Sequence, residues 1–119
     1  MIKGLGIDIT ELARIEAAQN KNAHFAQKVL TEAELAQYQA LSGRRAVEYL
    51  AGRFSVKEAY AKAYGTGLGT VALQDVETLT QAGGQPVITR HPFAGRALVS
   101  ISHTATLVMT EVILEADNA

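Results

Sequence analysis

A glutamate interrupts an apolar stripe in the segment from Arg44 to Tyr64, which is rich in alanine and has one glycine and no proline. When residues are placed about 100° apart, as in an α-helix, Glu58 falls near the middle of the stripe and Lys62 at its edge. The other members of the stripe are Val47, Leu50, Ala51, Phe54 and Ala61. Because burying a carboxylate without a partner is strongly unfavourable, this position requires a cation, a proton or a solvated cleft. The alternative is an exposed ion pair with Lys62, worth about 0.2–0.5 kcal/mol, and helix geometry leaves both interpretations open.

Asp8 is the second candidate, and it lies in an alternating segment near the N-terminus. One face of this segment carries Leu5, Ile7 and Ile9, and the other carries Gly4, Gly6 and Asp8. The alternation predicts a strand buried on one side, with the two glycines leaving open space beside Asp8. The more ordinary role for such an aspartate is to cap the helix that follows the strand.

A glycine-rich segment, Gly65 to Thr70, directly follows the long helical segment. Its amides could approach a phosphate closely, which makes Gly65 a candidate ligand-binding residue. The segment is not a Walker loop, because it lacks the Lys-Ser/Thr ending and does not link a strand to a helix. By itself it is more typical of a loop in which a left-handed glycine ends a helix.

Shorter helices are expected before the long one. Thr10 is predicted to cap a short first helix that carries Glu11 in its first turn and is interrupted by Asn20 and Asn22. Thr31 and Glu34 have the spacing of a capping box, which predicts a second helix that ends near Ser42.

The second half of the chain changes to β-branched runs separated by turn residues. The predicted strands are a hairpin over residues 76–80 and 87–89, and a closing antiparallel pair over residues 97–102 and 107–114. Together with the helices, these strands predict an α+β fold.

The composition bounds the possible functions. The chain has 119 residues, 48% hydrophobic and 19% charged, which is typical of one globular domain over residues 1–119. The lack of cysteine excludes disulfides and thiolate chemistry, and a formal net charge of −1 argues against a nucleic-acid-binding protein. No apolar run reaches the roughly 18 residues that span a bilayer, and no export signal is evident. We therefore expect a soluble, cytoplasmic protein that binds neither membrane nor nucleic acid.

Three separated motifs together resemble the family of holo-acyl-carrier-protein synthases. They are Gly6-Ile7-Asp8-Ile9, the segment from Gly52 to Gly67 with its central Lys57-Glu58-Ala59, and Ser100-Ile101-Ser102-His103-Thr104. The resemblance covers essentially the whole chain. It implies a phosphopantetheinyl transferase-like fold, with a long central helix on an antiparallel sheet.

The resemblance also implies an active site. In the family, an aspartate and a glutamate at the positions of Asp8 and Glu58 bind one Mg²⁺ together with the pyrophosphate of coenzyme A, which suits the preference of this ion for oxygen ligands. Lys62 matches the lysine at the pyrophosphate. The residues implied for the remainder of coenzyme A are Arg44, Arg53, Ser102 and His103. For these four, an ordinary surface role is an equally good interpretation.

The implied reaction is attack by a serine hydroxyl of apo-acyl carrier protein on the β-phosphate of coenzyme A. The products are the phosphopantetheinylated carrier and adenosine 3',5'-bisphosphate. The group that accepts the serine proton stays open between a magnesium-bound water and one of the two carboxylates.

A carrier-protein surface is expected near the first helix. If that helix continued past Asn22, a basic stripe with an aromatic residue would form from Arg14, Ala18, Lys21, Phe25 and Lys28. The alternative is two short solvated helices. The family uses several arginines here, and lysine lacks the bidentate fork of arginine, so we expect a different affinity or partner preference.

The family resemblance further implies a homotrimer with coenzyme A sites shared between subunits. Two other functions compete with the transferase. One is a non-catalytic trimeric binding module on the same scaffold, and the other is a nucleotide hydrolase with a metal at Asp8 and Glu58, for which no Walker loop is present.

Overall fold

The computed structural model describes residues 1–65 and 70–117. In chain order its elements are β1 (Ile2–Glu11), α1 (Leu12–Lys21), α2 (Phe25–Val29), α3 (Glu32–Gln39), α4 (Gly43–Tyr64), the short 3-10 helix η1 (Leu73–Asp75), β2 (Glu77–Thr80), β3 (Pro86–Arg90), β4 (Gly95–His103) and β5 (Leu107–Ala116). The predicted strands and the long helix are confirmed within a few residues. Residues 66–69 of the glycine-rich segment lie outside the described residues.

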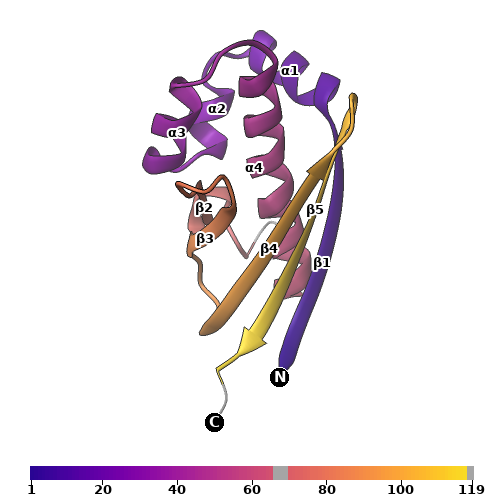
Figure 1. Cartoon of the computed structure of the whole chain (residues 1–119), viewed down its shortest axis with the longest axis vertical. Coiled ribbons are helices and arrows are strands. Elements are labelled where there is room, and N and C mark those ends of the chain that lie inside the picture. The colour runs from indigo at the N-terminus through magenta and orange to yellow at the C-terminus, as the bar shows by residue number, and fades with distance from the viewer. Residues whose placement is uncertain (66–69, 118–119) are drawn as a thin grey trace.

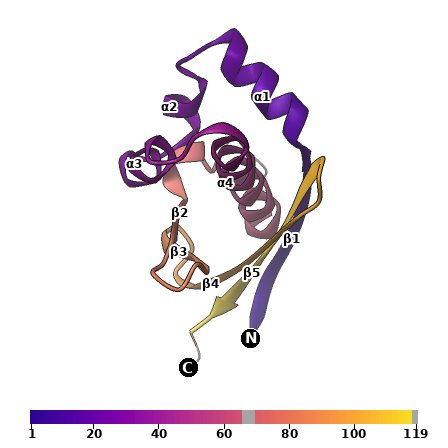
Figure 2. The same ribbon diagram turned by 45° about the horizontal axis from the view of Figure 1, so that its top comes forward.

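The helix α4 lies across one face of an antiparallel sheet with the strand order β1–β5–β4. The β2–β3 hairpin lies on the other side of α4, and α1, α2 and α3 gather around its N-terminal half (Figures 1 and 2). This arrangement confirms the predicted α+β fold with a long central helix on an antiparallel sheet.

Two apolar clusters hold α4 in place. Around its C-terminal half, Val56, Tyr60 and Ala61 pack with residues of the hairpin and of β5. Around its N-terminal half, Leu50 and Ala51 pack with residues of α1, α2 and β5. The long helix is therefore the common contact of the sheet, the hairpin and the short helices.

The face of β1 that meets α4 carries the glycines, which corrects the prediction of open space beside Asp8. A Cβ atom at Gly4 would lie 2.0 Å from the carbonyl oxygen of Ala63, and one at Gly6 would lie 1.9 Å from that of Ala59. Any side chain would clash there, so the glycines allow the backbones of strand and helix to touch. They close the space that the sequence pattern was expected to open.

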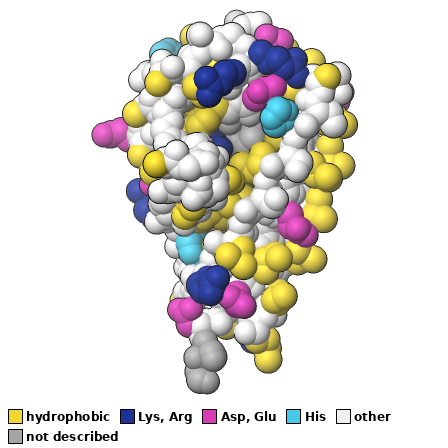
Figure 3. All heavy atoms as spheres, in the orientation of Figure 1, with side chains coloured by type: hydrophobic (Ala, Val, Ile, Leu, Met, Phe, Trp, Pro, Cys, Tyr) yellow, Lys and Arg dark blue, Asp and Glu magenta, His cyan; other side chains and the backbone are white. Residues whose placement is uncertain are grey.

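The apolar face of β1 points outward in a single chain. Leu5, Ile7 and Ile9 are 58%, 48% and 59% exposed, and Leu98 and Met109 on the neighbouring strands continue the surface. Figure 3 shows hydrophobic side chains gathered along the edge formed by the sheet. An exposed apolar surface of this kind marks an interaction site.

The short helices differ from the sequence prediction at the start of α1 and at Asn20, through which α1 continues to Lys21. The capping box of Thr31 and Glu34 is present at the start of α3, as predicted. Thr10 does not cap α1, because it is still paired within the sheet and Glu11 occupies the N-cap position without a side-chain bond. The Thr10 hydroxyl donates to Asp8 instead, at 2.6 Å. None of the described helices has the length and hydropathy needed to cross a lipid bilayer.

Candidate active site

The helix α4 carries three polar residues along one face, and two of them, Ser55 and Lys62, donate to β1. Ser55, Glu58 and Lys62 are three and four positions apart, so they lie above one another on the helix. Asp8 approaches this stripe from the inner face of β1, and both Ser55 and Lys62 donate to its carboxylate. The structure therefore brings Asp8 and Lys62 into contact and places Glu58 between Ser55 and Lys62 on the same face of α4.

The Asp8 carboxylate is held at both oxygens, and only 12% of its side chain is exposed. Oδ2 accepts from the hydroxyls of Thr10 at 2.6 Å and Ser55 at 2.8 Å. Oδ1 lies 3.4 Å from Nζ of Lys62. These contacts give Asp8 one orientation, in which Oδ1 is the oxygen directed toward the more exposed side of the site.

Lys62 reaches β1 instead of its neighbour one turn earlier. Its ammonium group donates to the carbonyl of Ile7 at 2.9 Å and to Asp8, and 55% of its side chain is exposed. No ion pair joins Lys62 to Glu58 in the part of the chain that the structure describes. The ordinary explanation for Glu58, an i,i+4 pair on a solvated face, is therefore not realised.

Glu58 is half-buried, and among the described residues no hydrogen bond to its carboxylate is found. Together with Asp8 it offers the hard oxygen donors that Mg²⁺ prefers. The described residues contain no group of three or more metal-ligating side chains. The pair thus fits an ion that also takes ligands from substrate and water, which is the common mode for Mg²⁺ at phosphate sites.

Arg44 and His103, two of the residues predicted for coenzyme A, meet at the N-terminal end of α4. Arg44 donates to Glu48 at 2.9 Å and to the carbonyl of Ala105 in the β4–β5 turn. Nδ1 of His103 lies 3.7 Å from the same Glu48 carboxylate. An open cavity of about 440 Å³ borders this cluster, lined by Gln37, Ala40, Leu41, Arg45, Glu48, Tyr49, Thr80 and His103.

Arg53 is turned away from these residues and is only 5% exposed. Its guanidinium donates to the carbonyl of Thr78 at 2.9 Å and to the hydroxyl of Thr80 at 2.7 Å, and it lies 4.1 Å from the ring centroid of Tyr49. Burial lowers the pKa of Arg53 from its ordinary value, and the nearby Tyr49 opposes this shift. In this chain Arg53 joins α4 to the hairpin, and its contact with coenzyme A stays a prediction.

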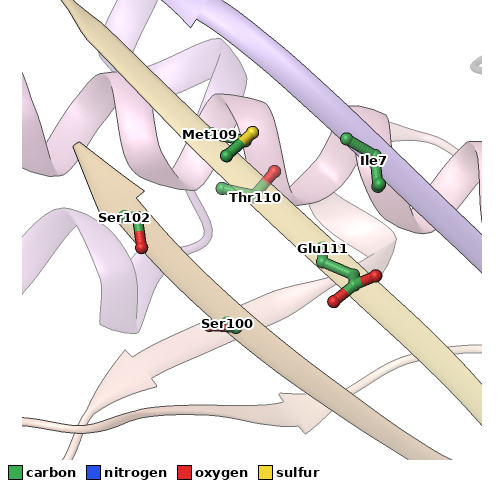
Figure 4. A pocket seen from close by; sticks show the side chains of 6 residues that line it. All are labelled: Ile7, Ser100, Ser102, Met109, Thr110 and Glu111. Carbon is green, nitrogen blue, oxygen red and sulfur yellow. The ribbon is translucent and has the colours of Figure 1, made fainter. Parts of the chain in front are cut away.

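Ser102 and Gly65 occupy two further positions. Ser102 is exposed on the outer face of the sheet, where it pairs with Met109 and lines a shallow pocket shared with Ile7, Ser100, Met109, Thr110 and Glu111 (Figure 4). Within one chain it therefore lies on the face opposite to Asp8. Gly65 ends α4 in the left-handed conformation with φ of 94°, as the sequence predicts for a helix terminus.

The predicted carrier-protein stripe is broken, because the first helix does not continue past Asn22. The Asn22 side chain accepts from the amide of His24 at 3.0 Å, which makes a turn between α1 and α2. Arg14 and Phe25 nevertheless meet at one ring, since the guanidinium of Arg14 lies 5.6 Å from the centroid of Phe54 and Phe25 lies 6.3 Å from it. Lys21 and Lys28 are exposed at the ends of α1 and α2.

Sequence reasoning missed the buried polar residues that support the site. Ser55, Thr10 and Thr110 are at most 2% exposed and form a hydrogen-bonded group with Asp8. A serine three residues before Glu58 on the same helix face was the available signal, but an isolated hydroxyl among small residues does not by itself predict a role.

A buried ion pair between α4 and α3 was also missed. Lys57 donates to Glu34 at 2.8 Å, with both side chains at most 1% exposed, and the same carboxylate accepts from the amides of Thr31 and Thr78. Burial lowers the pKa of Lys57, and Glu34 opposes this shift. Glu34 thus has two partners, Lys57 and Thr78, beyond its predicted capping role.

Comparison with known proteins agrees with this description. The family model of the 4'-phosphopantetheinyl transferase superfamily matches residues 4–113. A holo-[acyl-carrier-protein] synthase from Lacticaseibacillus casei (strain BL23) is 67% identical over 98% of this chain and 94% of that protein. The corresponding protein from Enterococcus faecalis (strain ATCC 700802 / V583) is 48% identical over 98% of this chain and all, 100%, of that protein.

Solved structures show the same fold. A holo-(acyl-carrier-protein) synthase from Bacillus anthracis str. Ames, in complex with CoA (3',5'-ADP), is 41% identical and gives a TM-score of 0.91 over 98% of this chain and 99% of that one. The Helicobacter pylori protein in complex with coenzyme A is 26% identical, with a TM-score of 0.82 over 93% and 99% of the two chains. The family and the fold expected from the three motifs are therefore confirmed. The chain belongs to the 4'-phosphopantetheinyl transferase superfamily and, within it, to the holo-[acyl-carrier-protein] synthases.

Proposed function

We propose that this chain transfers phosphopantetheine from coenzyme A to a serine of apo-acyl carrier protein, with Asp8, Glu58 and Lys62 at the reacting centre. The serine oxygen forms a new bond to the β-phosphorus, and the bond from that phosphorus to the bridging pyrophosphate oxygen breaks. Adenosine 3',5'-bisphosphate leaves, and the serine proton is released. The contact of Lys62 with Asp8, on the face of α4 that also carries Glu58, supports the proposal.

Asp8 and Glu58 are the residues that would hold Mg²⁺ in this site. When bound, the ion supplies positive charge at the pyrophosphate, which stabilises negative charge as the phosphoryl group is transferred. Lys62 adds a second positive charge, and its bonds to β1 hold it in place before substrate arrives. Positioning and charge, rather than covalent chemistry by the protein, account for the rate.

The remainder of coenzyme A is assigned to Arg44, Arg53, Gly65, Ser102 and His103. Arg44 and His103 support this assignment because both lie beside the carboxylate of Glu48, which with His103 lines the cavity near the start of α4. The relatives from B. anthracis and H. pylori were solved with this cofactor or its fragment, which supports a coenzyme A site in this chain. The carrier protein is assigned to the surface formed by Arg14, Lys21, Phe25 and Lys28.

The working unit in this proposal is a homotrimer in the cytoplasm, in which residues 1–119 form one domain. The outward apolar face of β1, β5 and β4 supports an association of chains through this sheet. Ser102 lies on that face, opposite to Asp8, so an association there would place it against a neighbouring chain. A site shared between subunits accounts for candidate residues on both faces of one sheet.

Incubation of the protein with coenzyme A, Mg²⁺ and apo-acyl carrier protein, followed by mass spectrometry of the carrier, tests the transfer. A mass gain of one phosphopantetheine is expected. Glu58→Gln removes the charge of a metal-binding residue at similar volume and is expected to lower the rate by about 100-fold or more while the protein stays folded. Glu32→Gln, an exposed glutamate of α3, is the matched control and should react at the wild-type rate.

A wild-type protein that leaves the carrier unmodified would overturn the proposed transfer. A Glu58→Gln variant with wild-type activity at ordinary Mg²⁺ concentrations would remove Glu58 from the metal site without affecting the rest of the proposal.

A further inference from the structure

Four polar side chains meet between the sheet and α4, behind the candidate metal site. Asp8 and Thr10 lie on the same face of β1, Thr110 lies opposite Asp8 on β5, and Ser55 faces them from α4. The three hydroxyl residues are 2%, 1% and 0% exposed in the order Thr10, Thr110 and Ser55. Buried polar groups are nearly always hydrogen-bonded, so each hydroxyl bond matters to the orientation of the carboxylate.

The direction of each hydrogen bond follows from which groups carry a proton to donate. In the ionised form that binds a cation, the Asp8 carboxylate only accepts, so Thr10 donates to Oδ2 at 2.6 Å and Ser55 donates to it at 2.8 Å. Ser55 has then used its one proton. The contact of 2.7 Å between the hydroxyls of Ser55 and Thr110 must therefore be a donation from Thr110 to Ser55.

These hydrogen-bond donors occupy Oδ2 of Asp8 and leave Oδ1 available to a ligand in the candidate site. Both hydroxyl bonds end on Oδ2, whereas Oδ1 is directed to Lys62, whose side chain is 55% exposed. Rotation of the carboxylate would break both bonds at once. Since a helix interior favours alanine over serine, the Ser55 hydroxyl is not explained by helix propensity.

We propose that Ser55, supported by Thr110, is a positioning residue that holds Asp8 with Oδ1 presented to the metal ion. The inference rests on the proposed function, because it assigns the held oxygen to the Mg²⁺ site. Residues that hydrogen-bond to metal ligands set the orientation of those ligands, and their removal typically lowers metal affinity by about 10- to 100-fold. Ser55 acts on the cation through Asp8 and does not contact the substrate.

Direct metal binding tests this role independently of turnover. The dissociation constant for Mn²⁺, used in place of Mg²⁺, is measured by electron paramagnetic resonance in the presence of coenzyme A, for the full chain and its variants. Ser55→Ala is expected to raise this constant by about 10-fold or more. In the transfer assay, KM for Mg²⁺ should rise in parallel, and kcat at saturating Mg²⁺ should change by less than about threefold.

Variants of Thr110, which donates to Ser55, provide a second test of the same role. Thr110→Val keeps the shape and removes the hydroxyl, so it should weaken Mn²⁺ binding, although less than Ser55→Ala. Thr110→Ser keeps the hydroxyl and should bind Mn²⁺ as the wild type does. Thr78→Val, which removes another buried hydroxyl in β2, is the matched control with unchanged binding. Thermal unfolding establishes whether each variant is folded. If Ser55→Ala does not fold, the comparison of Mn²⁺ affinity between Thr110→Val and Thr110→Ser tests the proposal.

The outcomes separate this inference from the proposed function. A wild-type protein that binds Mn²⁺ and transfers the group, together with folded Ser55→Ala and Thr110→Val variants of unchanged Mn²⁺ affinity, overturns the role of Ser55 alone. A wild-type protein that does neither overturns both. Equal weakening by Thr110→Ser and Thr110→Val would show that packing, and not the hydroxyl, matters at this position.

Discussion

The ammonium group of Lys62 is held by β1 at two points, the carbonyl of Ile7 and the carboxylate of Asp8. With 55% of its side chain exposed, the ion pair itself contributes little stability, about 0–1 kcal/mol. Its importance lies in position, because a charge that is already in place at a transferring phosphate needs no rearrangement during the reaction. The same logic applies to Asp8, whose orientation is set by buried hydroxyls.

Two residue-level features lead to predictions. The first concerns His91, which joins the end of β3 to α4. The amide of Phe93 donates to the Tyr60 hydroxyl at 2.9 Å, and in the neutral His91 tautomer with an unprotonated Nδ1 this hydroxyl donates its proton to Nδ1 across 3.0 Å. That bond requires a neutral imidazole, and burial lowers the pKa of His91 from its ordinary value of 6.5.

The free energy of unfolding should therefore depend on pH through His91. Below about pH 6.5 the unfolded chain binds more protons than the folded chain, so the stabilisation present above that pH is lost as the pH falls toward the lower folded-state pKa. Urea unfolding at about pH 7.5 and about pH 5.5 measures the loss. His91→Gln should show a smaller loss between the two, and an equal loss in both proteins would contradict this role.

The second prediction concerns Arg14, which lies over the Phe54 ring on the candidate carrier-protein surface. Arg14→Glu reverses a charge that would face an acidic partner, so KM for apo-acyl carrier protein should rise by about 10-fold or more, while the dissociation constant for coenzyme A stays the same. Steady-state kinetics and calorimetry measure the two. Arg96→Glu, at an exposed site on β4, is the control. A selective loss of coenzyme A binding in Arg14→Glu would contradict the assignment.

At the scale of elements, α4 is constrained from two sides. The backbone of β1 touches it through Gly4 and Gly6, and the hairpin is tied to it by the buried cations Arg53 and Lys57. Glu34 of α3 accepts from Lys57 and so joins a third element to the same helix. Buried charges of this kind are strongly destabilising when one partner is removed, which makes the register of α4 against its neighbours specific. Glu58 and Lys62 take their positions from that register.

Two glycines provide a matched test of the contact between β1 and α4. Gly6→Ala places a Cβ atom 1.9 Å from the Ala59 carbonyl and should destabilise the protein by about 3 kcal/mol or more, since backbone must move. Gly52→Ala adds a Cβ atom 3.8 Å from the Ile101 side chain and should be neutral or stabilise α4 by up to about 1 kcal/mol. Urea unfolding of both variants decides the point. Similar stabilities for the two would show that the strand and helix do not approach as closely as described.

At the scale of the whole molecule, the sheet has one face against α4 and one apolar face that a single chain leaves exposed. Ile7, Ile9 and Met109 on that face are each about half exposed. A large apolar surface is a liability for a monomer, and burial between identical chains removes it. Association would therefore complete the packing of the sheet as well as the proposed site.

Ile7→Lys tests this association. A charge at the middle of the apolar face should convert the expected trimer into monomers, as measured by light scattering after size-exclusion chromatography, because each burial would desolvate three ammonium groups. Transfer activity should be lost with the trimer. Val87→Lys places the same charge on an exposed residue of β3 and should leave the mass unchanged. A wild-type protein that is monomeric at assay concentrations would contradict the trimer.

Local signals in the sequence predicted most of the elements. The capping box of Thr31 and Glu34 and the terminating Gly65 predict helix ends because they satisfy backbone groups within a few residues. Thr10 misled the prediction, because its hydroxyl has a competing partner two residues earlier in the strand. A capping bond forms between neighbours in the sequence. Whether the Thr10 hydroxyl binds Asp8 or caps α1, however, depends on where the strand pairs within the sheet.

The sequence alone determined the family and the long helix with Glu58 in its apolar stripe, and the family resemblance implied a joint role for Asp8 and Glu58. Only the tertiary structure decided which face of β1 is buried, since alternation is the same whichever side meets the helix, and only contact with α4 requires glycine there. It also decided that Lys62 contacts Asp8, that Ser55 donates to the Asp8 carboxylate, and that Thr110 is hydrogen-bonded to Ser55. These contacts join segments far apart in the chain, and their geometry depends on how closely the backbones approach, which no local pattern encodes.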